Sequence, residues 1–281
     1  MAYGAPSGAG SGARERTAEE AGRAAANGAG GSADRDVAPS AGKQGVTRLT
    51  LPPSSRIAVF TAHPDDETGC SGTIARLADQ GHEVHLVVAT DGDAGSPHAG
   101  YGPGELARIR HEELEAAAAI LGIRQIHWLN FADGTLAQQP DLRRRVYDAM
   151  RMVEPTVLLC MDPWAVDEPH PDHRTICMTA FEAAYLANGE DYFPEQIEAG
   201  RKAHHTEEVY FFHTARGNRS VRVGPDVIER KIAALSCHRS QMPVGTPRWE
   251  ERMASWRDRA ARDLVEDLHR VGWSEIELGL D

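Results

Sequence analysis

The chain has 281 residues, of which 41% are hydrophobic and 26% charged, and its net charge is −12. This length suits one α/β domain with a sizeable core, or at most two small ones, and the negative charge argues against sequence-independent binding to nucleic-acid phosphates or to an anionic membrane surface. The cysteines are widely spaced and form no CxxC pair, and the N-terminus does not resemble a signal peptide, which predicts a cytoplasmic protein. The chain has no run of about 18 apolar residues, so we expect no membrane span.

The N-terminal segment, residues 1–46, is predicted to be a disordered tail. It consists mainly of small and charged residues, with almost no large apolar side chain. Such a segment cannot bury enough surface to offset the entropy lost on ordering. Residues 47–281 have the composition of a folded protein, show no internal repeat and are predicted to form one domain.

Apolar runs and amphipathic stretches alternate along this domain. Strands are predicted at 56–61, 83–89, 125–131, 155–161 and 208–213, and helices at 71–80, 105–121, 141–153, 172–188 and 225–235. A charged amphipathic stretch, 248–271, comes last. This alternation predicts a Rossmann-like three-layer α/β/α fold, whose mostly parallel sheet is covered by helices on both faces. Ligands of such sheets bind at the carboxyl ends of the strands.

A histidine and three acidic residues directly follow the first predicted strand. The segment Ala62-His-Pro-Asp-Asp-Glu67 crowds like charges in a way that is unfavourable unless a cation compensates them. Because the loop enters a helix, positions three apart face one way, which groups His63 with Asp66 and leaves Asp65 close to the ion. The alternative is that these acids only stabilise a helix N-terminus, which does not explain the preceding histidine and proline.

A second histidine pair, His170 and His173, follows the fourth predicted strand and therefore lies at the same edge of the sheet. Taken alone, the pair would be interpreted as solvated loop histidines. Together with the first motif it favours a metal site, in which His173 completes a set with His63 and Asp66. A catalytic zinc typically has three protein ligands and an open fourth position.

The motif AHPDDE after a first strand, with HPDH about a hundred residues later, resembles the LmbE-like or PIG-L family of zinc-dependent N-acetylglucosamine deacetylases. The resemblance covers roughly residues 54–245 and makes residues 47–281 the catalytic domain. Further motifs occur in the same order: Thr90-Asp-Gly-Asp-Ala-Gly95, Arg110 with Glu113, Asp133-Gly134, Asp162-Pro-Trp164, and the segment 231–241.

The resemblance implies one Zn²⁺ per chain, held by His63, Asp66 and His173, with other divalent metals such as Fe²⁺ compatible with the same ligands. Asp65 is similar to the general base of the family. His170 is similar to the residue that, if protonated, stabilises the charge developing on the carbonyl oxygen. Two more residues are similar to those that contact sugar hydroxyls in family members, namely Arg110 and Asp133.

The expected activity is hydrolysis of the acetamide of an N-acetylglucosamine-type amino sugar, free or within a glycoconjugate or secondary-metabolite intermediate. The expected partner is this small molecule, and a homo-oligomer is compatible with the sequence. A related hypothesis is that the protein is an amidase, which cleaves a larger N-acyl group or a thiol conjugate.

Two remote alternatives are a non-haem Fe(II) enzyme and a catalytically dead sugar-binding module. Iron oxygenases usually carry His-x-Asp on a β-barrel strand, whereas this chain has His-x-x-Asp in an α/β pattern. The complete set of metal and catalytic residues argues against a dead module.

Overall fold

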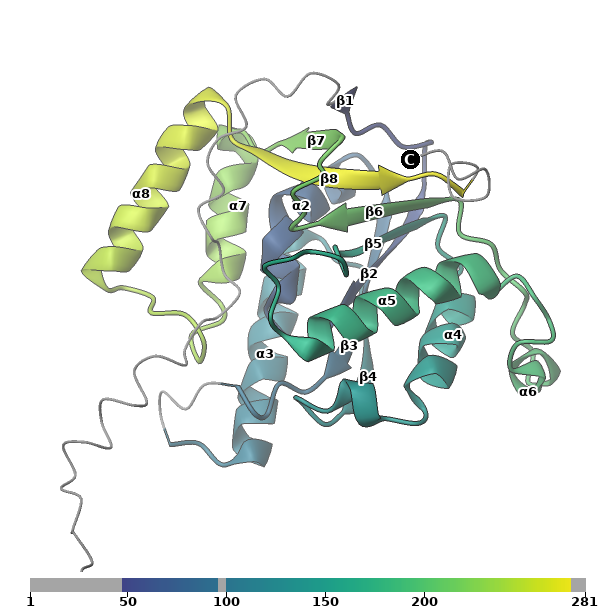
Figure 1. Ribbon diagram of the computed structural model, residues 1–281. Helices are drawn as coiled ribbons and strands as arrows, with labels where there is room; N and C mark the ends of the chain where they lie inside the picture. The colour runs from purple at the N-terminus through teal and green to yellow at the C-terminus, as the bar shows by residue number, and fades with distance from the viewer. Residues whose placement is uncertain (1–46, 96–99, 274–281) are drawn as a thin grey trace, which may run out of the picture. The chain divides into compact units, whose positions relative to one another are not determined.

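The computed structural model describes residues 47–95 and 100–273, so the predicted tail over 1–46 lies outside the described residues. Figure 1 shows the elements in place. The strands are β1 (Thr47–Arg48), β2 (Arg56–Thr61), β3 (Glu83–Thr90), β4 (Gln125–Phe131), β5 (Val157–Met161), β6 (Glu208–Phe212), β7 (Arg219–Arg222) and β8 (Val265–Val271). The helices are α2 (Ser71–Asp79), α3 (Pro103–Leu121), α4 (Leu142–Val153), α5 (Pro171–Leu186), α6 (Pro194–Glu198), α7 (Pro225–Leu235) and α8 (Pro247–Arg262), with short 3₁₀ helices η2 (Asp66–Cys70) and η3 (Leu136–Gln138).

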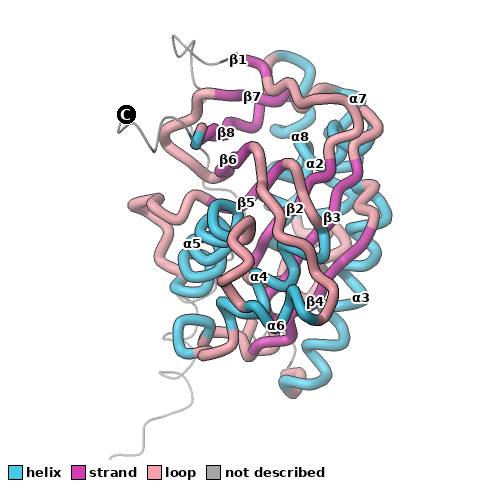
Figure 2. The backbone as a smooth tube through the Cα atoms, turned by 90° about the vertical axis from the view of Figure 1, so that its right-hand side faces the viewer, coloured by secondary structure: helices cyan, strands magenta, loops and turns pink. Residues whose placement is uncertain are grey.

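The strands form one sheet in the order β1-β7-β8-β6-β5-β2-β3-β4, which Figure 2 shows from the side. The five strands from β6 to β4 are parallel, and Val59 of β2 pairs with Leu86 on one side and with Leu159 on the other. Strand β8 is antiparallel to both β6 and β7. The predicted, mostly parallel sheet is therefore confirmed.

Helices cover both faces of this sheet. Helices α2 and α3 pack against α7 on one face, while α4 packs against α5 on the other (Figure 1). Helix α8 packs on the outside of α7. This arrangement confirms the predicted three-layer α/β/α fold.

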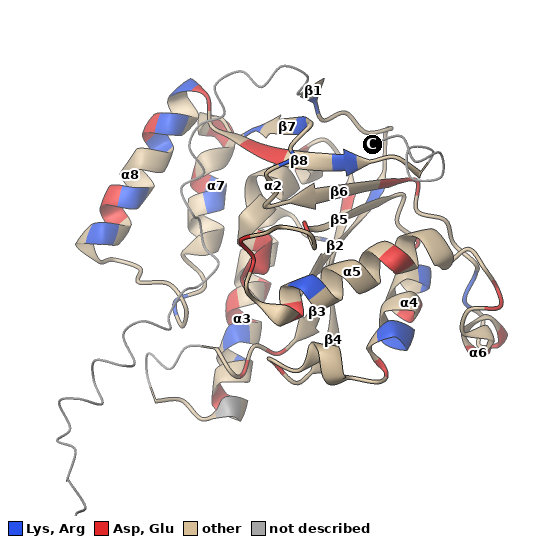
Figure 3. Cartoon of the chain, viewed as in Figure 1, with Lys and Arg blue, Asp and Glu red and all other residues tan. Residues whose placement is uncertain are grey.

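The sheet is buried between the helical layers, which explains the apolar runs of the sequence. All residues of β5 are buried and none is charged, as expected for a strand that is covered on both faces. Figure 3 shows that basic residues (blue) and acidic residues (red) both occur along the outer helix α8. Among the described residues, no helix is long and apolar enough to cross a bilayer.

The predicted elements agree with the structure to within two residues at each end, except in the last stretch. The charged segment 248–271 divides into helix α8 and strand β8. In β8, Leu268 is fully buried, and its neighbours pair with β6 and β7. The charged residues of this segment lie on the surface of a helix and on a strand near the sheet edge. Because of these charges the strand lacks a clear apolar periodicity, so it could not be predicted from the sequence.

The order of the strands determines where a ligand can bind. From β2 the chain proceeds through β3 to β4 on one side, and then returns to β5 on the other side of β2. The loops after β2 and β5 therefore diverge from neighbouring strand ends and open a crevice at a topological switch point. The two histidine motifs lie in these loops.

Candidate metal centre

Three predicted residues meet at this crevice. His63 Nδ1 lies 3.1 Å from His173 Nε2, and Asp66 Oδ1 lies 3.2 Å from the same His173 atom. The second carboxylate oxygen of Asp66 is 3.6 Å from His63 Nδ1. All three residues are buried. The structure thus brings together residues that are 110 positions apart in the chain.

These separations fit a divalent cation. Two ligand atoms bound at about 2.1 Å in a tetrahedral arrangement are about 3.4 Å apart. Two imidazole nitrogens and one carboxylate oxygen form a donor set that suits Zn²⁺ and Fe²⁺. Two other groups also have ligand atoms within 4.8 Å of one another. They are His63 with His170 and His173, and His63 with Asp133 and Asp172.

The loop after β2 is held in place by its own aspartate. Asp66 Oδ2 accepts hydrogen bonds from the backbone N–H of Ala62, at 3.0 Å, and of His63, at 2.8 Å. Asp65, which lies between His63 and Asp66 in this loop, has a positive φ of 136°, which is unfavourable for a residue with a side chain. Backbone strain of this kind persists only where the surroundings impose it, and it is concentrated at functional sites.

Each of the two histidines turns its other ring nitrogen toward a carboxylate. His63 Nε2 lies 2.9 Å from Asp133 Oδ1, and His173 Nδ1 lies 3.1 Å from Glu168 Oε1. A carboxylate behind a histidine ligand fixes the ring orientation and raises its basicity. Asp133, expected to contact sugar, therefore faces His63 in the structure. Glu168 was not predicted, and its only signal in the sequence is its place five residues before His173.

The site attracts positive charge. Burial alone would lower the pKa of His173, but Asp66 and Glu168 raise it to about 10. The pKa of His63 is likewise raised well above its ordinary value, because Asp133, Asp172 and Asp66 outweigh the effect of burial. The pKa of Asp66 is held well below its usual range by the two histidines, despite burial.

His170 precedes helix α5 and caps it, since its Nδ1 accepts the backbone N–H of Asp172 at 3.3 Å. Burial and the nearby His63 and His173 lower the pKa of His170. The ring is therefore neutral near pH 7, with its proton on Nε2. Its centroid lies 4.5 Å from that of His63, so this residue also belongs to the cluster.

Asp65 lies beside Arg110. Arg110 Nη2 is 3.0 Å from Asp65 Oδ1, and the arginine side chain is only 4% exposed. Burial raises the pKa of Asp65 and Arg110 opposes this rise. Arg110, the second expected sugar contact, is thus placed against the predicted base.

Several buried groups behind the site have no counterpart among the predicted residues. Glu67 and His238 are fully buried and lie 2.7 Å apart. Asp172 accepts the backbone N–H groups of Gly134 and Leu136, which ties the loop after β4 to the start of α5. These residues support the loops that carry the cluster, and nothing local in the sequence marks them as partners.

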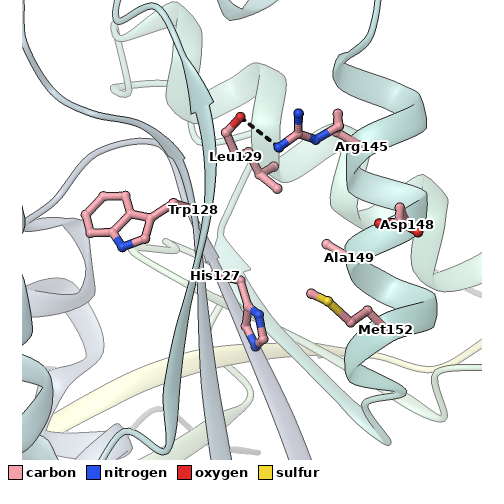
Figure 4. A pocket seen from close by; sticks show the side chains of 7 residues that line it. All are labelled: His127, Trp128, Leu129, Arg145, Asp148, Ala149 and Met152. Carbon is pink, nitrogen blue, oxygen red and sulfur yellow. Dashed lines mark hydrogen bonds between the residues drawn. The ribbon is translucent and has the colours of Figure 1, made fainter.

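A cavity of about 240 Å³ lies elsewhere, between strand β4 and helix α4 (Figure 4). It is lined by His127, Trp128, Leu129, Arg145, Asp148, Ala149 and Met152. Its arginine donates to the carbonyl oxygen of Leu129 at 3.2 Å. None of the lining residues belongs to the histidine and carboxylate cluster, so this cavity is separate from the candidate site.

Known proteins are similar to this chain in sequence. Residues 58–185 match the PIG-L family, described as GlcNAc-PI de-N-acetylase. Over 196 residues the chain is 34% identical to the diacetylchitobiose deacetylase of Thermococcus kodakarensis, which covers 69% of this chain and 72% of that protein. It is also 28% identical over 208 residues to the 4-oxalmesaconate hydratase of Pseudomonas putida, covering 69% and 76%.

A solved structure has a similar fold. The N,N'-diacetylchitobiose deacetylase from Pyrococcus horikoshii, complexed with its inhibitor MPG, is similar to this structure with a TM-score of 0.72. The sequences are 28% identical, and the match covers 79% of this chain and 85% of that one.

Proposed function

Because this chain belongs to the PIG-L family of GlcNAc-PI de-N-acetylases, we propose that it hydrolyses the N-acetyl group of an N-acetylglucosamine-type amino sugar. The observation that carries the proposal is the buried cluster of two histidines and Asp66 at the switch point, with Asp65 beside it. Similarity alone would not suffice, since one relative is named as a hydratase.

The proposed metal ligands are His63 Nδ1, Asp66 and His173 Nε2, holding one Zn²⁺. This set is preferred to the two other groups because it leaves the outer nitrogen of each histidine against a carboxylate. When bound, the ion supplies Lewis acidity, which activates water and polarises the amide carbonyl.

Asp65 is the proposed general base. The amide carbon accepts water, the C–N bond breaks, and the amine leaves with a proton. A carboxylate can take the proton of the attacking water and deliver it to the amine nitrogen. Burial raises the pKa of Asp65, which makes its carboxylate a better proton acceptor than an exposed aspartate.

His170 is the proposed donor to the carbonyl oxygen as negative charge develops there. A positive imidazolium is not required, since the neutral ring has an Nε2–H group when Nδ1 accepts from the backbone. Removal of one such donor typically lowers the rate on the order of 10²–10³-fold. Contact of Asp133 with the sugar stays a prediction.

The test is an assay of purified protein with Zn²⁺ supplied, using N-acetylglucosamine and diacetylchitobiose as substrates. We expect acetate and a primary amine to appear in equal amounts, and both to stop when the metal is chelated. The same preparation is then given 4-oxalmesaconate and an N-acylated thiol conjugate. Conversion of either, with no acetate released from either sugar, would replace the proposal with hydratase or amidase activity.

A further inference from the structure

We propose that Trp164 and Arg216 form a subsite that binds a second sugar ring of the substrate, beyond the ring that carries the N-acetyl group. This inference rests on the proposed function and deepens it. It narrows the substrate class to N-acetylated oligosaccharides or glycoconjugates in which a further ring is linked to the N-acetylated sugar.

Trp164 is an accessible aromatic residue whose ring is held in place. The residue is 46% exposed. Its ring nevertheless packs edge-to-face with Phe181 and Phe211, at centroid distances of 5.4 and 5.5 Å. A ring that is already fixed loses little conformational entropy when a ligand covers it, and burial of its apolar surface is favourable. An exposed indole of this kind is therefore suited to packing against a ligand.

The loop that carries Trp164 is anchored by Asp162, which directly follows β5 and is only 2% exposed. Its carboxylate accepts the backbone N–H of Trp164 at 3.0 Å and the hydroxyl of Thr214 at 2.7 Å. Both of its oxygens also accept Arg216 Nη2, each at 3.0 Å. These contacts join the loop after β5 to the loop after β6, so the indole and the guanidinium are positioned before a ligand arrives.

Arg216 adds hydrogen-bond donors beside the indole. Its guanidinium carbon lies 5.7 Å from the centroid of the Trp164 ring, and its side chain is 52% exposed. A pyranose ring has apolar C–H faces and a rim of hydroxyl groups. The indole suits such a face, and the guanidinium N–H groups suit the hydroxyl oxygens. The pair thus offers the two kinds of contact that a sugar ring needs.

The loop geometry places this subsite near the candidate metal centre. The backbone N–H of Glu168 donates to the carbonyl oxygen of Ala165 at 3.3 Å, which closes a turn. Cα atoms across a turn are less than about 7 Å apart, so the Cα of Trp164 lies within about 11 Å of that of Glu168. Glu168 in turn lies 3.1 Å from the proposed ligand His173. A short oligosaccharide with its acetamide at the metal centre can span this interval.

The subsite predicts a selectivity for the longer substrate. The parent protein should have a higher kcat/KM for diacetylchitobiose than for N-acetylglucosamine. Trp164→Ala should lower kcat/KM for the disaccharide on the order of 10-fold, because an aromatic contact and its burial are lost. The loss should appear mainly in KM, since the contact is remote from the reacting amide, and the value for the monosaccharide should change by less than about twofold. Trp164→Phe should recover part of the loss.

The control is Val166→Ala. Val166 lies in the same loop and is 98% exposed, so its variant should keep the parent selectivity. Metal content and melting temperature are measured for every variant. An equal loss of selectivity in Val166→Ala, or loss of the metal in Trp164→Phe, would show that the loop only supports the fold and would overturn the proposal. If Trp164→Ala does not fold, Trp164→Phe decides, because a selectivity equal to that of the parent contradicts the subsite.

A binding measurement separates this inference from the proposed function. Asp65→Asn removes the proposed base, so calorimetry can compare the dissociation constants of diacetylchitobiose and N-acetylglucosamine without turnover. We expect the disaccharide to bind more tightly, and Trp164→Ala to remove the difference. If the parent releases no acetate from either sugar, the proposed function fails, whereas a Trp164-dependent preference for the disaccharide still supports the subsite. Equal affinity for the two sugars, or binding of neither, would overturn it.

The other occupant to be tested is a second copy of the chain. Light scattering should give the same molar mass for the parent and for Trp164→Ala. A lower mass of the variant, with unchanged selectivity between the two sugars, would show that the indole lies at an interface between copies and would contradict the subsite.

Discussion

His63 and His173 each use both ring nitrogens, one toward the other histidine and one toward a carboxylate. The geometry of the site therefore depends on how each of these two rings is oriented. A buried histidine without an acceptor behind it could rotate or exchange its proton between the two nitrogens. With Asp133 and Glu168 close to the outer nitrogens, the inward nitrogens are available as ligands.

Asp65→Ala should keep the metal and lose nearly all turnover. The variant removes a carboxylate that is next to the proposed ligands but outside the set, so metal affinity should stay near that of the parent. General acid–base help of this kind is worth about 10²–10⁴-fold in rate. Metal content per chain and acetate release together check the prediction. A variant that turns over at close to the parent rate would show that another group is the base.

Glu168→Gln should weaken metal binding without abolishing it. The variant exchanges the carboxylate behind His173 for a neutral amide, which lowers the basicity of the ring. Loss of such a partner typically reduces metal affinity about 10–100-fold. Competition with a zinc chelator measures the change. Glu182→Gln is the control, since Glu182 is an exposed carboxylate on helix α5, which also carries His173; a similar loss of affinity in both variants would refute the specific role of Glu168.

At the scale of elements, the loop after β2 and the helices η2 and α2 that follow it are supported by Lys231 and Glu266, which come much later in the chain. Glu266 of β8 accepts the backbone N–H of Gly72 at 3.0 Å and that of Thr73 at 2.6 Å, at the N-terminus of α2. Lys231 Nζ lies 2.9 Å from this carboxylate and donates to the carbonyl oxygen of Thr68 at 2.8 Å. The ion pair is almost fully buried, so it fixes η2 and α2 against α7 and β8.

Glu266→Ala should therefore destabilise the fold. It removes the carboxylate that pairs with Lys231 and that accepts the first N–H groups of α2. Breaking a buried pair on one side typically costs about 3–5 kcal/mol in the free energy of unfolding. Urea titration measures this, with Asp226→Asn as the control, since the pair of Asp226 with Arg76 lies near the surface. Equal effects of the two variants would contradict a supporting role of Glu266.

Much of the architecture can be predicted from the sequence, because its central strands are short apolar runs between helices. Arg56–Thr61 and Gln125–Phe131 have the same bounds in the sequence and in the structure. Strand β8 could not be predicted, since its charged residues hide the pattern of burial. Its pairing with β6 and β7 depends on contacts that no local pattern specifies.

Some residues of the candidate site could be predicted from the sequence and others could not. His63, Asp66 and His173 could be proposed as a group because they follow two neighbouring parallel strands. The partners of His173 and Glu67 could not be inferred, since Glu168 lies in an irregular loop and His238 is 171 residues away from Glu67. The place of Arg110 against Asp65 also required the structure, because one residue comes from α3 and the other from the loop after β2.

For the whole molecule, the balance of charge at the site links metal binding to pH. The structure raises the pKa of His173 to about 10 and that of His63 well above its ordinary value. Near pH 7 and without a metal, the pair therefore holds at least one proton more than two neutral rings, since one hydrogen fills the 3.1 Å contact between His63 Nδ1 and His173 Nε2. A metal needs them neutral, so protons compete with the ion, and the apparent affinity must rise as pH rises.

Binding of Zn²⁺ near neutral pH should thus release at least one proton per chain, and less as the pH approaches 10. Calorimetry in two buffers of different ionisation enthalpy counts them. His111→Gln serves as the control, since this half-exposed histidine pairs with Asp91 and is not a proposed ligand. Zinc binding near pH 7 without proton release would show that these histidines are not the ligands.

The loop after β2 is supported by residues that are synthesised much later, and this has a consequence for biosynthesis. Lys231, His238 and Glu266 follow their partners Thr68, Glu67 and Gly72 by 163, 171 and 194 residues. A nascent chain that has just emerged through α5 already contains both histidine motifs, but the loop after β2 still lacks its support. We therefore expect the proposed metal to be held stably only after β8 has left the ribosome and joined the sheet.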